Sequence, residues 1–370
     1  MKTLFFCNLI PDKRGAYEAL LVALGREFRA AGDELVLVFA RDPVPAVAAD
    51  FRAAGLRWEL IEGWSSGAGR EHAWAFCRPA LGLVRRERPD VAVVNFGNEL
   101  PTLAVALATP RTRWVWVQHQ QMQDPSPLAR HVSRIRLLSF AVAHFIAVYE
   151  GGRESLRKRG ISAKRVSFVD NAIQDFMPTR PAGWLAQELG LARDTPLVVT
   201  TGWLIPRKRI DFGLRAFARV VGDAVLLVIG EGPERAELER LAGELGVAGR
   251  VRFLGRRNDV REILPECAVL MHTSLAETCT YAITEAMAAS VPAVVTEAGA
   301  AREQIADGES GFVLAREDVD GLAGRLSLLL NDAAMRARFG AAARARFLAR
   351  YTLENSARRY HELYRAVAGR

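Results

Sequence analysis

The chain has 370 residues, of which 50% are hydrophobic and 25% charged, and its formal net charge at pH 7 is +8. This is an ordinary composition for a soluble protein, and the length suffices for two domains with substantial cores. No apolar run approaches the roughly 20 residues that span a bilayer, and the first ten residues, which precede no cleavage site of small residues, predict a buried strand rather than a signal peptide.

The first half of the chain alternates apolar runs with amphipathic stretches. Strands are expected at 2–9, 34–40, 57–61, 91–95, 113–118 and 145–148. Helices are expected at 17–31, 44–54, 70–86, 101–108 and 126–143. Such alternation is typical of a parallel sheet with helices on both faces, which binds its ligands at the carboxyl ends of the strands.

The second half repeats this alternation after a linker at 166–181, which is rich in turn formers. Strands are expected at 197–201, 225–229, 250–254, 268–272 and 293–296, and helices at 210–221, 234–245, 260–264, 280–289 and 301–306. After Asp318 the chain is expected to be helical to its end. The pattern predicts an α/β protein with two doubly wound domains and a cleft between them.

Two carboxylates, Glu277 and Glu285, stand out in the segment 274–292. The small and apolar neighbours of Glu285 predict a helix that is buried nearly all round. A carboxylate in such a place needs hydrogen-bond donors, and the sugar hydroxyls of a nucleotide would supply them. Thr278 or Thr280 can cap the helix, whose N-terminal amides would suit a phosphate. The same spacing also occurs on solvated helices.

A second polar segment, 202–211, follows a predicted strand and opens a helix. Lys208 lies beside the expected helix start, where a cation and the helix dipole both favour a diphosphate. Asp211 is expected to cap that helix, and Arg207 or Arg209 can add positive charge. A basic surface loop is the alternative interpretation of this segment.

The order of these segments resembles the retaining glycosyltransferases of family 4, which have the GT-B architecture of two Rossmann-like domains facing across a cleft. Gly202 and Lys208 match the family's glycine and lysine, but Trp203 stands where the family has an arginine. The family commonly has Gly-Phe-Gly after the first glutamate, where this chain has residues 278–280. The resemblance covers nearly the whole chain and is strongest at 197–314.

The resemblance also assigns residues in the first half of the chain. Gly15 lies in a loop expected near the donor phosphate or the acceptor, and His119 ends a strand near the transferred sugar. A histidine in such a place is, taken alone, more often structural. The donor-binding residues that the resemblance implies are Gly15, Gly202, Arg207, Lys208, Arg256, Glu277, Thr278, Cys279, Thr280, Tyr281 and Glu285.

What the resemblance implies is transfer of a hexose from a nucleotide-diphospho-sugar to a hydroxyl of a glycan, a glycolipid or a small molecule. His119, Lys208 and Glu277 would be the catalytic residues. No cofactor or essential metal is expected, because no Asp-x-Asp stands at a suitable strand end. An N-terminal acceptor-side domain is expected at 1–175, joined by a crossing helix at about 353–370, and a nucleotide-sugar domain at 180–350.

Two other functions fit the same residues: a nucleotide-sugar epimerase or hydrolase, and a non-catalytic nucleotide-binding relative, which Trp203 and residues 278–280 would favour. The basic region 130–165 indicates either contact with an anionic membrane surface or an ordinary solvated surface. It lacks the aromatic pattern of a nucleic-acid module, so no nucleic-acid partner is expected. A cytoplasmic location is expected, with or without membrane association, and the cysteines show no metal or redox spacing.

Overall fold

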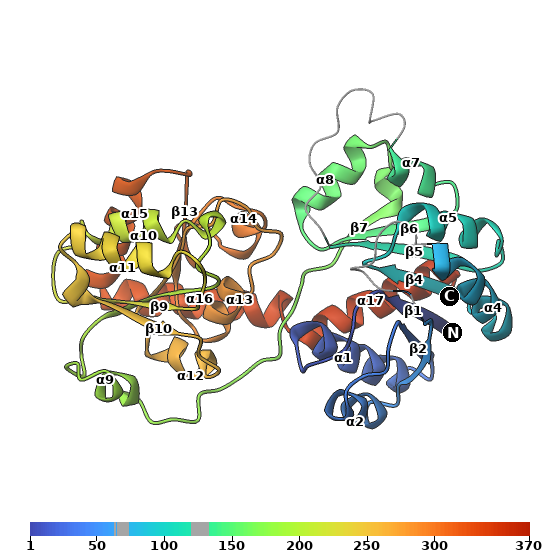
Figure 1. Ribbon diagram of the computed structural model, residues 1–370, viewed down its shortest axis with the longest axis horizontal. Helices are drawn as coiled ribbons and strands as arrows, with labels where there is room; N and C mark the ends of the chain where they lie inside the picture. The colour runs from blue at the N-terminus through green and yellow to red at the C-terminus, as the bar shows by residue number, and fades with distance from the viewer. Residues whose placement is uncertain (63, 65–73, 120–132) are drawn as a thin grey trace. The chain divides into compact units, whose positions relative to one another are not determined.

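The computed structural model describes residues 1–62, 64, 74–119 and 133–370 (Figure 1). The chain divides into two compact units. We call residues Met1–Gln174 with Thr352–Arg370 the N-terminal domain, and residues Asp175–Tyr351 the C-terminal domain. The last helix of the chain is thus built into the N-terminal domain.

The N-terminal domain holds a parallel sheet whose described strands follow the order β3-β2-β1-β4-β5-β6-β7. The strands are β1 Lys2–Cys7, β2 Glu34–Phe39, β3 Arg57–Leu60, β4 Val91–Asn95, β5 Arg113–Gln118, β6 Val142–Ala147 and β7 Val166–Phe168. Its described helices are α1 Ala16–Ala30, α2 Pro45–Ala53, α4 Cys77–Glu87, α5 Glu99–Leu107, α7 Arg134–Leu138, α8 Glu150–Lys158 and α17 Leu353–Ala368, with short 3-10 turns η1 Trp74–Phe76 and η2 Ala163–Arg165.

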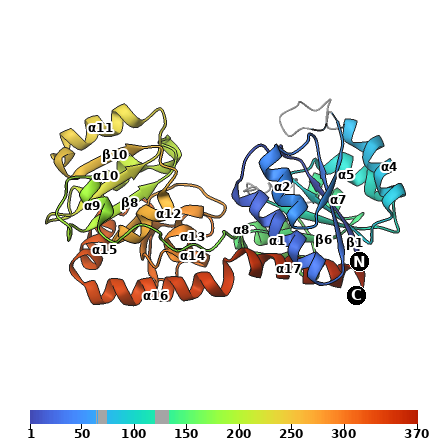
Figure 2. The same cartoon turned by 90° about the horizontal axis from the view of Figure 1, so that it is seen from below.

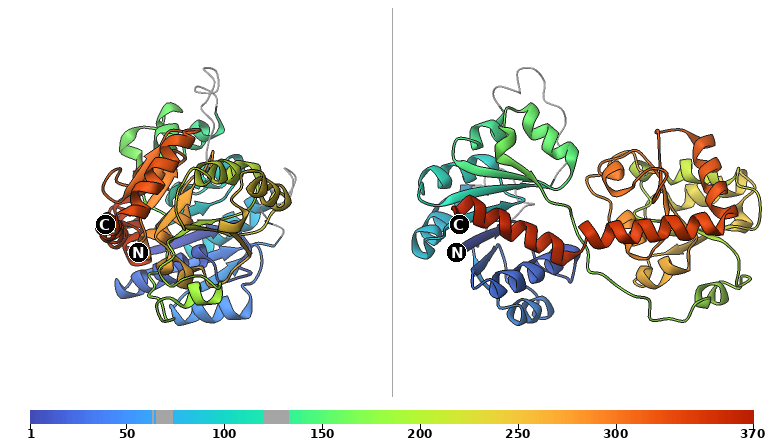
Figure 3. Two further views of the ribbon diagram at one scale, coloured as in Figure 1. Left: turned by 90° about the vertical axis from the view of Figure 1, so that its left-hand side faces the viewer. Right: turned by 180° about the vertical axis from the view of Figure 1, so that it is seen from behind.

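Burial of apolar residues between the sheet and its helices stabilises the N-terminal domain. The central strand β1 is buried from Thr3 to Cys7, as expected for a strand that helices cover on both faces. Helix α17 packs against α1 (Figure 3). Between the two helices, the ring of Phe28 lies 4.6 Å from that of His361 and 6.4 Å from that of Tyr364. The C-terminal helix therefore completes the core of a domain that the start of the chain begins.

The C-terminal domain holds a second parallel sheet with the strand order β10-β9-β8-β11-β12-β13. The strands are β8 Leu197–Thr201, β9 Val225–Ile229, β10 Val251–Gly255, β11 Val269–His272, β12 Ala293–Thr296 and β13 Gly311–Leu314. The helices are α9 Trp184–Glu188, α10 Ile210–Phe217, α11 Arg235–Glu244, α12 Val260–Ile263, α13 Tyr281–Ala288, α14 Ala301–Gln304, α15 Val319–Asn331 and α16 Ala333–Arg350, with 3-10 turns η3 Pro206–Lys208, η4 Ala248–Arg250 and η5 Leu264–Glu266. Helix α16 packs against α13 (Figure 2).

The expectation of an α/β protein with two doubly wound, parallel-sheet domains is confirmed. In each sheet the strand order reverses once beside a central strand, between β1 and β4 and between β8 and β11. Ligands of such sheets bind at this point, outside the carboxyl ends of the strands. The fold therefore directs attention to the loops that follow β1, β4, β8 and β11.

Several predicted elements were wrong in detail. The predicted linker 166–181 begins with strand β7, which pairs with β6, and β13 was not predicted. Both strands are short and lie at sheet edges, where few residues carry the pattern. The predicted helix 126–143 holds only α7 in its described part, and Val142 already begins β6; residues 126–132 lie outside the described residues, as do 70–73 of the predicted helix 70–86. None of the described helices is both long and apolar enough to cross a membrane.

Candidate functional site

Two loops of the C-terminal domain lie side by side at the reversal point of its sheet. The first, 202–209, follows β8, and the second, 273–280, follows β11. The hydroxyl of Thr273 donates to the carbonyls of Lys208 and Arg209 at 3.0 and 2.8 Å, and the amide of Leu275 donates to Arg207 O at 2.9 Å. These bonds fix the two loops to each other although they are far apart in sequence.

Glycines allow the first loop to approach its neighbour closely. Gly202 has φ +145°, a conformation that side chains other than glycine rarely adopt. A Cβ atom on Gly230 would lie 1.8 Å from Gly202 O, and one on Gly232 would lie 2.3 Å from Leu204 O. The Gly230-Glu231-Gly232 segment thus packs on the backbone of the loop that carries Lys208.

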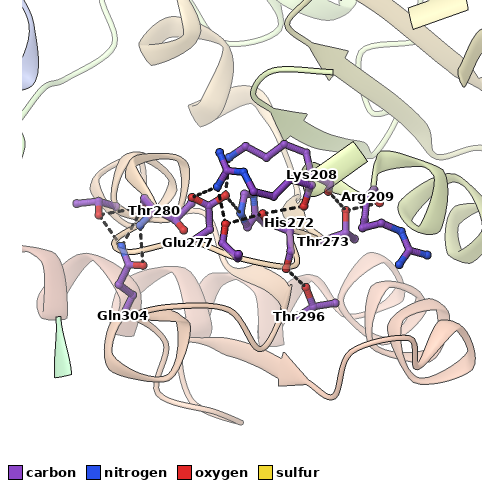
Figure 4. Close-up of polar contacts among 12 residues, drawn as sticks. Lys208, Arg209, His272, Thr273, Glu277, Thr280, Thr296 and Gln304 are labelled. Carbon is purple, nitrogen blue, oxygen red and sulfur yellow. Dashed lines mark hydrogen bonds and ion pairs between the residues drawn. The ribbon is translucent and has the colours of Figure 1, made fainter. Parts of the chain in front are cut away.

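Lys208 and Glu277 form the centre of the candidate site (Figure 4). Lys208 Nζ lies 2.6 Å from Glu277 Oε1, and Arg207 Nη1 lies 3.8 Å from Glu277 Oε2. The Glu277 side chain is 11% exposed. Burial opposes ionisation of this carboxyl, but the neighbouring His272 and Lys208 outweigh it and lower the pKa of Glu277 to about 2. The site is therefore a buried anion beside two cations.

His272 is a site residue that the sequence did not single out. It ends β11 and is 3% exposed, and its Nε2 lies 3.6 Å from Glu277 Oε1. Burial lowers the pKa of His272, so its imidazole is neutral near pH 7. A histidine at the end of a buried strand, five residues before the candidate glutamate, is the signal that could have found it.

The loop from Glu277 to Thr280 is held by the segment that follows β12. A Cβ atom on Gly299 would lie 2.1 Å from Glu277 O, and the amide of Ala300 donates to Thr278 O at 2.9 Å. The buried Gln304 donates to Thr280 O at 2.9 Å. Gly299 therefore lets this segment approach the backbone of the loop, and Ala300 and Gln304 hold the loop by hydrogen bonds.

Thr280 holds the N-cap position of α13, as predicted, but its side chain makes no cap hydrogen bond. Its hydroxyl oxygen is buried and has no hydrogen-bond partner within the described residues. Asp211 was predicted to cap α10, and this was wrong: Arg209 holds the N-cap position, and Asp211 accepts a hydrogen bond from Arg209 at 3.0 Å in the first turn. The positive φ of Arg209, +49°, turns the chain into the helix two residues earlier.

Glu285 lies in the second turn of α13, and its helix is not buried all round as expected. Tyr281 is 41% exposed and Glu285 is half-buried, while Ile283, Thr284 and Ala286 are fully buried. Burial raises the pKa of Glu285, and the positive charge of Arg261 partly offsets this effect. Within the described residues the side chain of Glu285 makes no hydrogen bond or salt bridge, so its carboxylate is available to a ligand.

The remaining predicted donor residues of this domain differ in exposure. Cys279 is buried, whereas Arg256 is exposed just after β10. Trp203, at the family's arginine position, is 73% exposed. Gly202, Arg207, Lys208, Glu277 and Thr280 lie on the two adjoining loops described above. Within the described part of the chain, no three His, Cys, Asp or Glu side chains are grouped as metal ligands would be.

The N-terminal domain places His119 among polar and aromatic residues at the carboxyl ends of β4 and β5. His119 Nε2 lies 2.9 Å from Asn95 Oδ1, and the imidazole stacks on Phe96 with ring centroids 4.2 Å apart. Tyr17 meets both rings edge-on. Burial lowers the pKa of His119 to about 3, which keeps the ring neutral near pH 7.

This cluster also shows strain and unsatisfied polar atoms. Phe96 has φ +55°, an unfavourable backbone conformation for an aromatic residue. Asn8 Oδ1 and Asn95 Nδ2 are buried without a partner among the described residues. Gly15, which was predicted to lie near the donor phosphate or the acceptor, donates its backbone amide to Glu18 Oε2 at 3.1 Å. No disulfide joins the four cysteines, Cys7, Cys77, Cys267 and Cys279.

Comparisons with known proteins match both halves of the chain. Residues 185–346 match the family described as Glycosyl transferases group 1, and residues 18–175 match Glycosyltransferase Family 4. The chain is 29% identical over 182 residues to N-acetyl-alpha-D-glucosaminyl L-malate synthase of Bacillus anthracis, which covers 49% of this chain and 48% of that protein. It is 33% identical over 151 residues to the lipopolysaccharide core biosynthesis glycosyltransferase LpsE of Rhizobium meliloti, covering 41% and 44%.

These matches span a little under half the length of the two relatives. Solved structures share the fold over the whole chain. Anabaena HepE, solved in complex with UDP, has a TM-score of 0.79 at 21% identity and covers 99% of this chain and 100% of its own. WaaG, a glycosyltransferase involved in lipopolysaccharide biosynthesis, has a TM-score of 0.67 at 17% identity, with both chains fully covered.

Proposed function

Because the chain belongs to the glycosyltransferases of group 1 and family 4, we propose that it transfers a hexose from a nucleotide-diphospho-sugar to an acceptor hydroxyl with retention of configuration. The observation that carries this proposal is the partly buried Lys208–Glu277 pair at the reversal point of the C-terminal sheet. A cation next to a buried carboxylate suits a ligand that has both a diphosphate and sugar hydroxyls. The retaining outcome rests on the family resemblance.

Each proposed role follows from the charge and place of the side chain. Lys208, helped by Arg207, stabilises the negative charge that develops on the leaving diphosphate. Glu277 accepts hydrogen bonds from the donor sugar, and Glu285 accepts them from the ribose hydroxyls. His119, a neutral imidazole, contacts the transferred sugar or the acceptor. Since cationic side chains supply the charge stabilisation, we propose that the reaction needs no metal.

Relatives suggest which donors to try first. HepE was solved with UDP-glucose, and a mannosyltransferase of Corynebacterium glutamicum is described as GDP-mannose-dependent. We therefore propose a uridine or guanosine diphosphate sugar as donor. Trp203 and residues 278–280, which depart from the family pattern around the diphosphate and sugar, are proposed to set which sugar is accepted.

A thermal-shift screen tests the donor site. The compounds are uridine, guanosine, adenosine and thymidine diphosphates and their common sugar conjugates, with and without a chelator. A ligand present at about 100 times its dissociation constant stabilises the folded state by roughly 2.7 kcal/mol. We expect the nucleotides of one base to raise the melting temperature, and to raise it by the same amount with and without the chelator.

The same screen separates the rival functions. A shift followed by free sugar or altered sugar nucleotide, without any acceptor, would indicate a hydrolase or an epimerase. Binding without turnover across lipid, glycan and small-molecule acceptors would indicate a non-catalytic relative. Absence of a shift with every nucleotide would contradict the proposed donor site.

We also propose that the N-terminal domain contacts an anionic membrane surface through the basic region 130–165, of which residues 130–132 lie outside the described residues. Phe140 is 78% exposed and Leu137 is 38% exposed at the end of α7. The exposed basic residues of this region's described part are Arg134, Arg157, Lys158 and Lys164. Exposed apolar groups beside basic ones are the combination that binds an anionic interface.

Vesicle sedimentation tests this surface. Binding to vesicles that contain phosphatidylglycerol should exceed binding to pure phosphatidylcholine, because each basic side chain near an anionic surface contributes about 1 kcal/mol, or roughly fivefold in affinity. Phe140→Asp should weaken binding, and Val221→Asp, at a residue 90% exposed in the C-terminal domain, is the matched control. Equal binding to both vesicle types would contradict the proposal.

A further inference from the structure

Glu277 has two nitrogen neighbours at one oxygen atom. Lys208 Nζ is 2.6 Å from Oε1, and His272 Nε2 is 3.6 Å from the same oxygen (Figure 4). Only the shorter distance is a hydrogen bond. His272 Nε2 is buried and has no hydrogen-bond partner among the described residues. A buried polar nitrogen without a partner is unfavourable, so a slightly closer approach of Glu277 would be stabilising.

Lys208 has a second partner in the proposed function. A diphosphate carries more negative charge than one carboxylate, so at equal distance it attracts the ammonium group more strongly. The lysine side chain is flexible and carries three N–H donors, which lets it turn toward a new anion. When it does so, the short hydrogen bond to Glu277 lengthens or is lost.

The side chain of His272, in contrast, cannot move toward the diphosphate. His272 is fixed in β11, where it is paired with Val295 of β12, and its side chain is 4% exposed. The next residue, Thr273, is tied by its hydroxyl to the backbone of Lys208 and Arg209. The imidazole therefore keeps its place beside Glu277 whatever the side chain of Lys208 does.

We propose that His272 is a positioning residue, whose Nε2–H holds the carboxylate of Glu277 in place once the donor diphosphate has drawn Lys208 away. This inference rests on the proposed function of Lys208. The other cation near Glu277 is Arg207, which is 3.8 Å from Oε2 with its side chain 50% exposed, so solvent screens its charge. The Ser274 hydroxyl also lowers the pKa of Glu277, but it donates to the carbonyls of Arg207 and Ala276. His272 is neutral and buried, and its Nε2 has no such competing partner among the described residues.

The first test needs no sugar nucleotide and follows the titration of Glu277 by NMR in protein with isotope-labelled glutamate. The Glu277 signal is identified by its absence from the spectrum of Glu277→Gln. In Lys208→Met, which mimics the loss of the lysine, the pKa of Glu277 should stay below its ordinary value of 4.5, because the carboxylate then moves closer to His272 and accepts a hydrogen bond from it. In Lys208→Met/His272→Leu the pKa of Glu277 should be higher than in Lys208→Met, because burial is then opposed only by the Ser274 hydroxyl and the exposed Arg207. Lys208→Met/His144→Leu is the control for loss of a histidine.

The second test measures kinetics with UDP-glucose as the probe. His272→Leu should lower kcat by about tenfold to a hundredfold through misplacement of Glu277, with the larger loss at low pH and little change in KM. His272→Gln, which keeps an N–H donor, should restore part of the rate. A residue that acts only in folding would lower the melting temperature and show no such dependence on pH.

The two tests fail in different ways. Identical Glu277 titrations in Lys208→Met and Lys208→Met/His272→Leu would overturn the role of His272, whether or not the protein is a transferase. Absence of binding to every sugar nucleotide would overturn the proposed function, while the titration would still decide whether His272 holds Glu277.

Discussion

Replacing Lys208 by Met should reduce the rate of sugar transfer by about 10²–10³-fold, the usual loss when a group that stabilises developing charge is removed from a buried site. Met keeps much of the apolar length of the side chain but removes the charge that faces Glu277. The measurement is kcat with the donor that the thermal-shift screen identifies. The loss should appear in kcat, since the charge on the leaving diphosphate is largest in the transition state.

Controls separate charge stabilisation from folding. Arg193→Met removes an exposed positive charge from the same C-terminal domain and should leave kcat unchanged. The lowered pKa of Glu277 adds stability that is fully present above its unfolded value of 4.5 and is lost as the pH falls toward about 2. The difference in melting temperature between wild type and Lys208→Met should therefore shrink over that range. A loss of less than threefold in kcat at unchanged stability would refute the assigned role of Lys208.

Replacing Glu285 by Gln should weaken binding of the nucleotide diphosphate by about tenfold to a hundredfold, because a hydrogen bond to a charged group contributes about 1.5–3 kcal/mol. The same change should raise the melting temperature of the ligand-free protein near pH 7. Burial raises the pKa of Glu285, so its charge destabilises the folded state increasingly as the pH rises above 4.5. The measurements are isothermal titration with the diphosphate and melting curves between pH 4 and pH 8.

Glu309→Gln is the matched control, because Glu309 is exposed in the same domain and its side chain makes no hydrogen bond or salt bridge within the described residues. Glu309→Gln should change neither the nucleotide affinity nor the melting temperature of the ligand-free protein. Unchanged nucleotide affinity in a correctly folded Glu285→Gln protein would show that the ribose assignment is wrong. A lowered melting temperature would instead show that Glu285 has a structural partner.

Local sequence patterns predicted most of the fold. The strands β1, β2, β4, β5, β8 and β9 are continuous apolar runs between turn residues, and each was predicted at nearly its observed bounds. The strands that were missed, β7 and β13, are short edge strands. These two strands form because a neighbouring strand supplies hydrogen bonds, and their own few residues carry little pattern that predicts a strand.

The helix predicted at 126–143 failed for a related reason. Residues 142–147 carry apolar residues that suit a buried helix or a buried strand, and periodicity alone does not separate the two. Pairing of β6 with β5 on one side and β7 on the other selects the strand. Pairing within the sheet thus decided between two structures that the local pattern allows equally.

The sequence by itself determined the class of fold and the two charged residues at the centre of the site, because strand–helix alternation and motif order are properties of neighbouring residues. It also placed Gly202, Lys208, Glu277 and Glu285 on the correct elements. It did not show that Lys208 and Glu277, 69 positions apart, are bonded to each other.

Only the tertiary structure decided how the site is assembled. Lys208 becomes a neighbour of Glu277 because β8 and β11 adjoin in the sheet and their loops are hydrogen-bonded to each other, and Gly230 and Gly299 become close-contact positions because β9 adjoins β8 and β12 adjoins β11. Which strands adjoin depends on packing and hydrogen bonding over the whole domain. Contacts of this kind join residues that carry no local pattern in common, and a local reading of the chain therefore leaves them out.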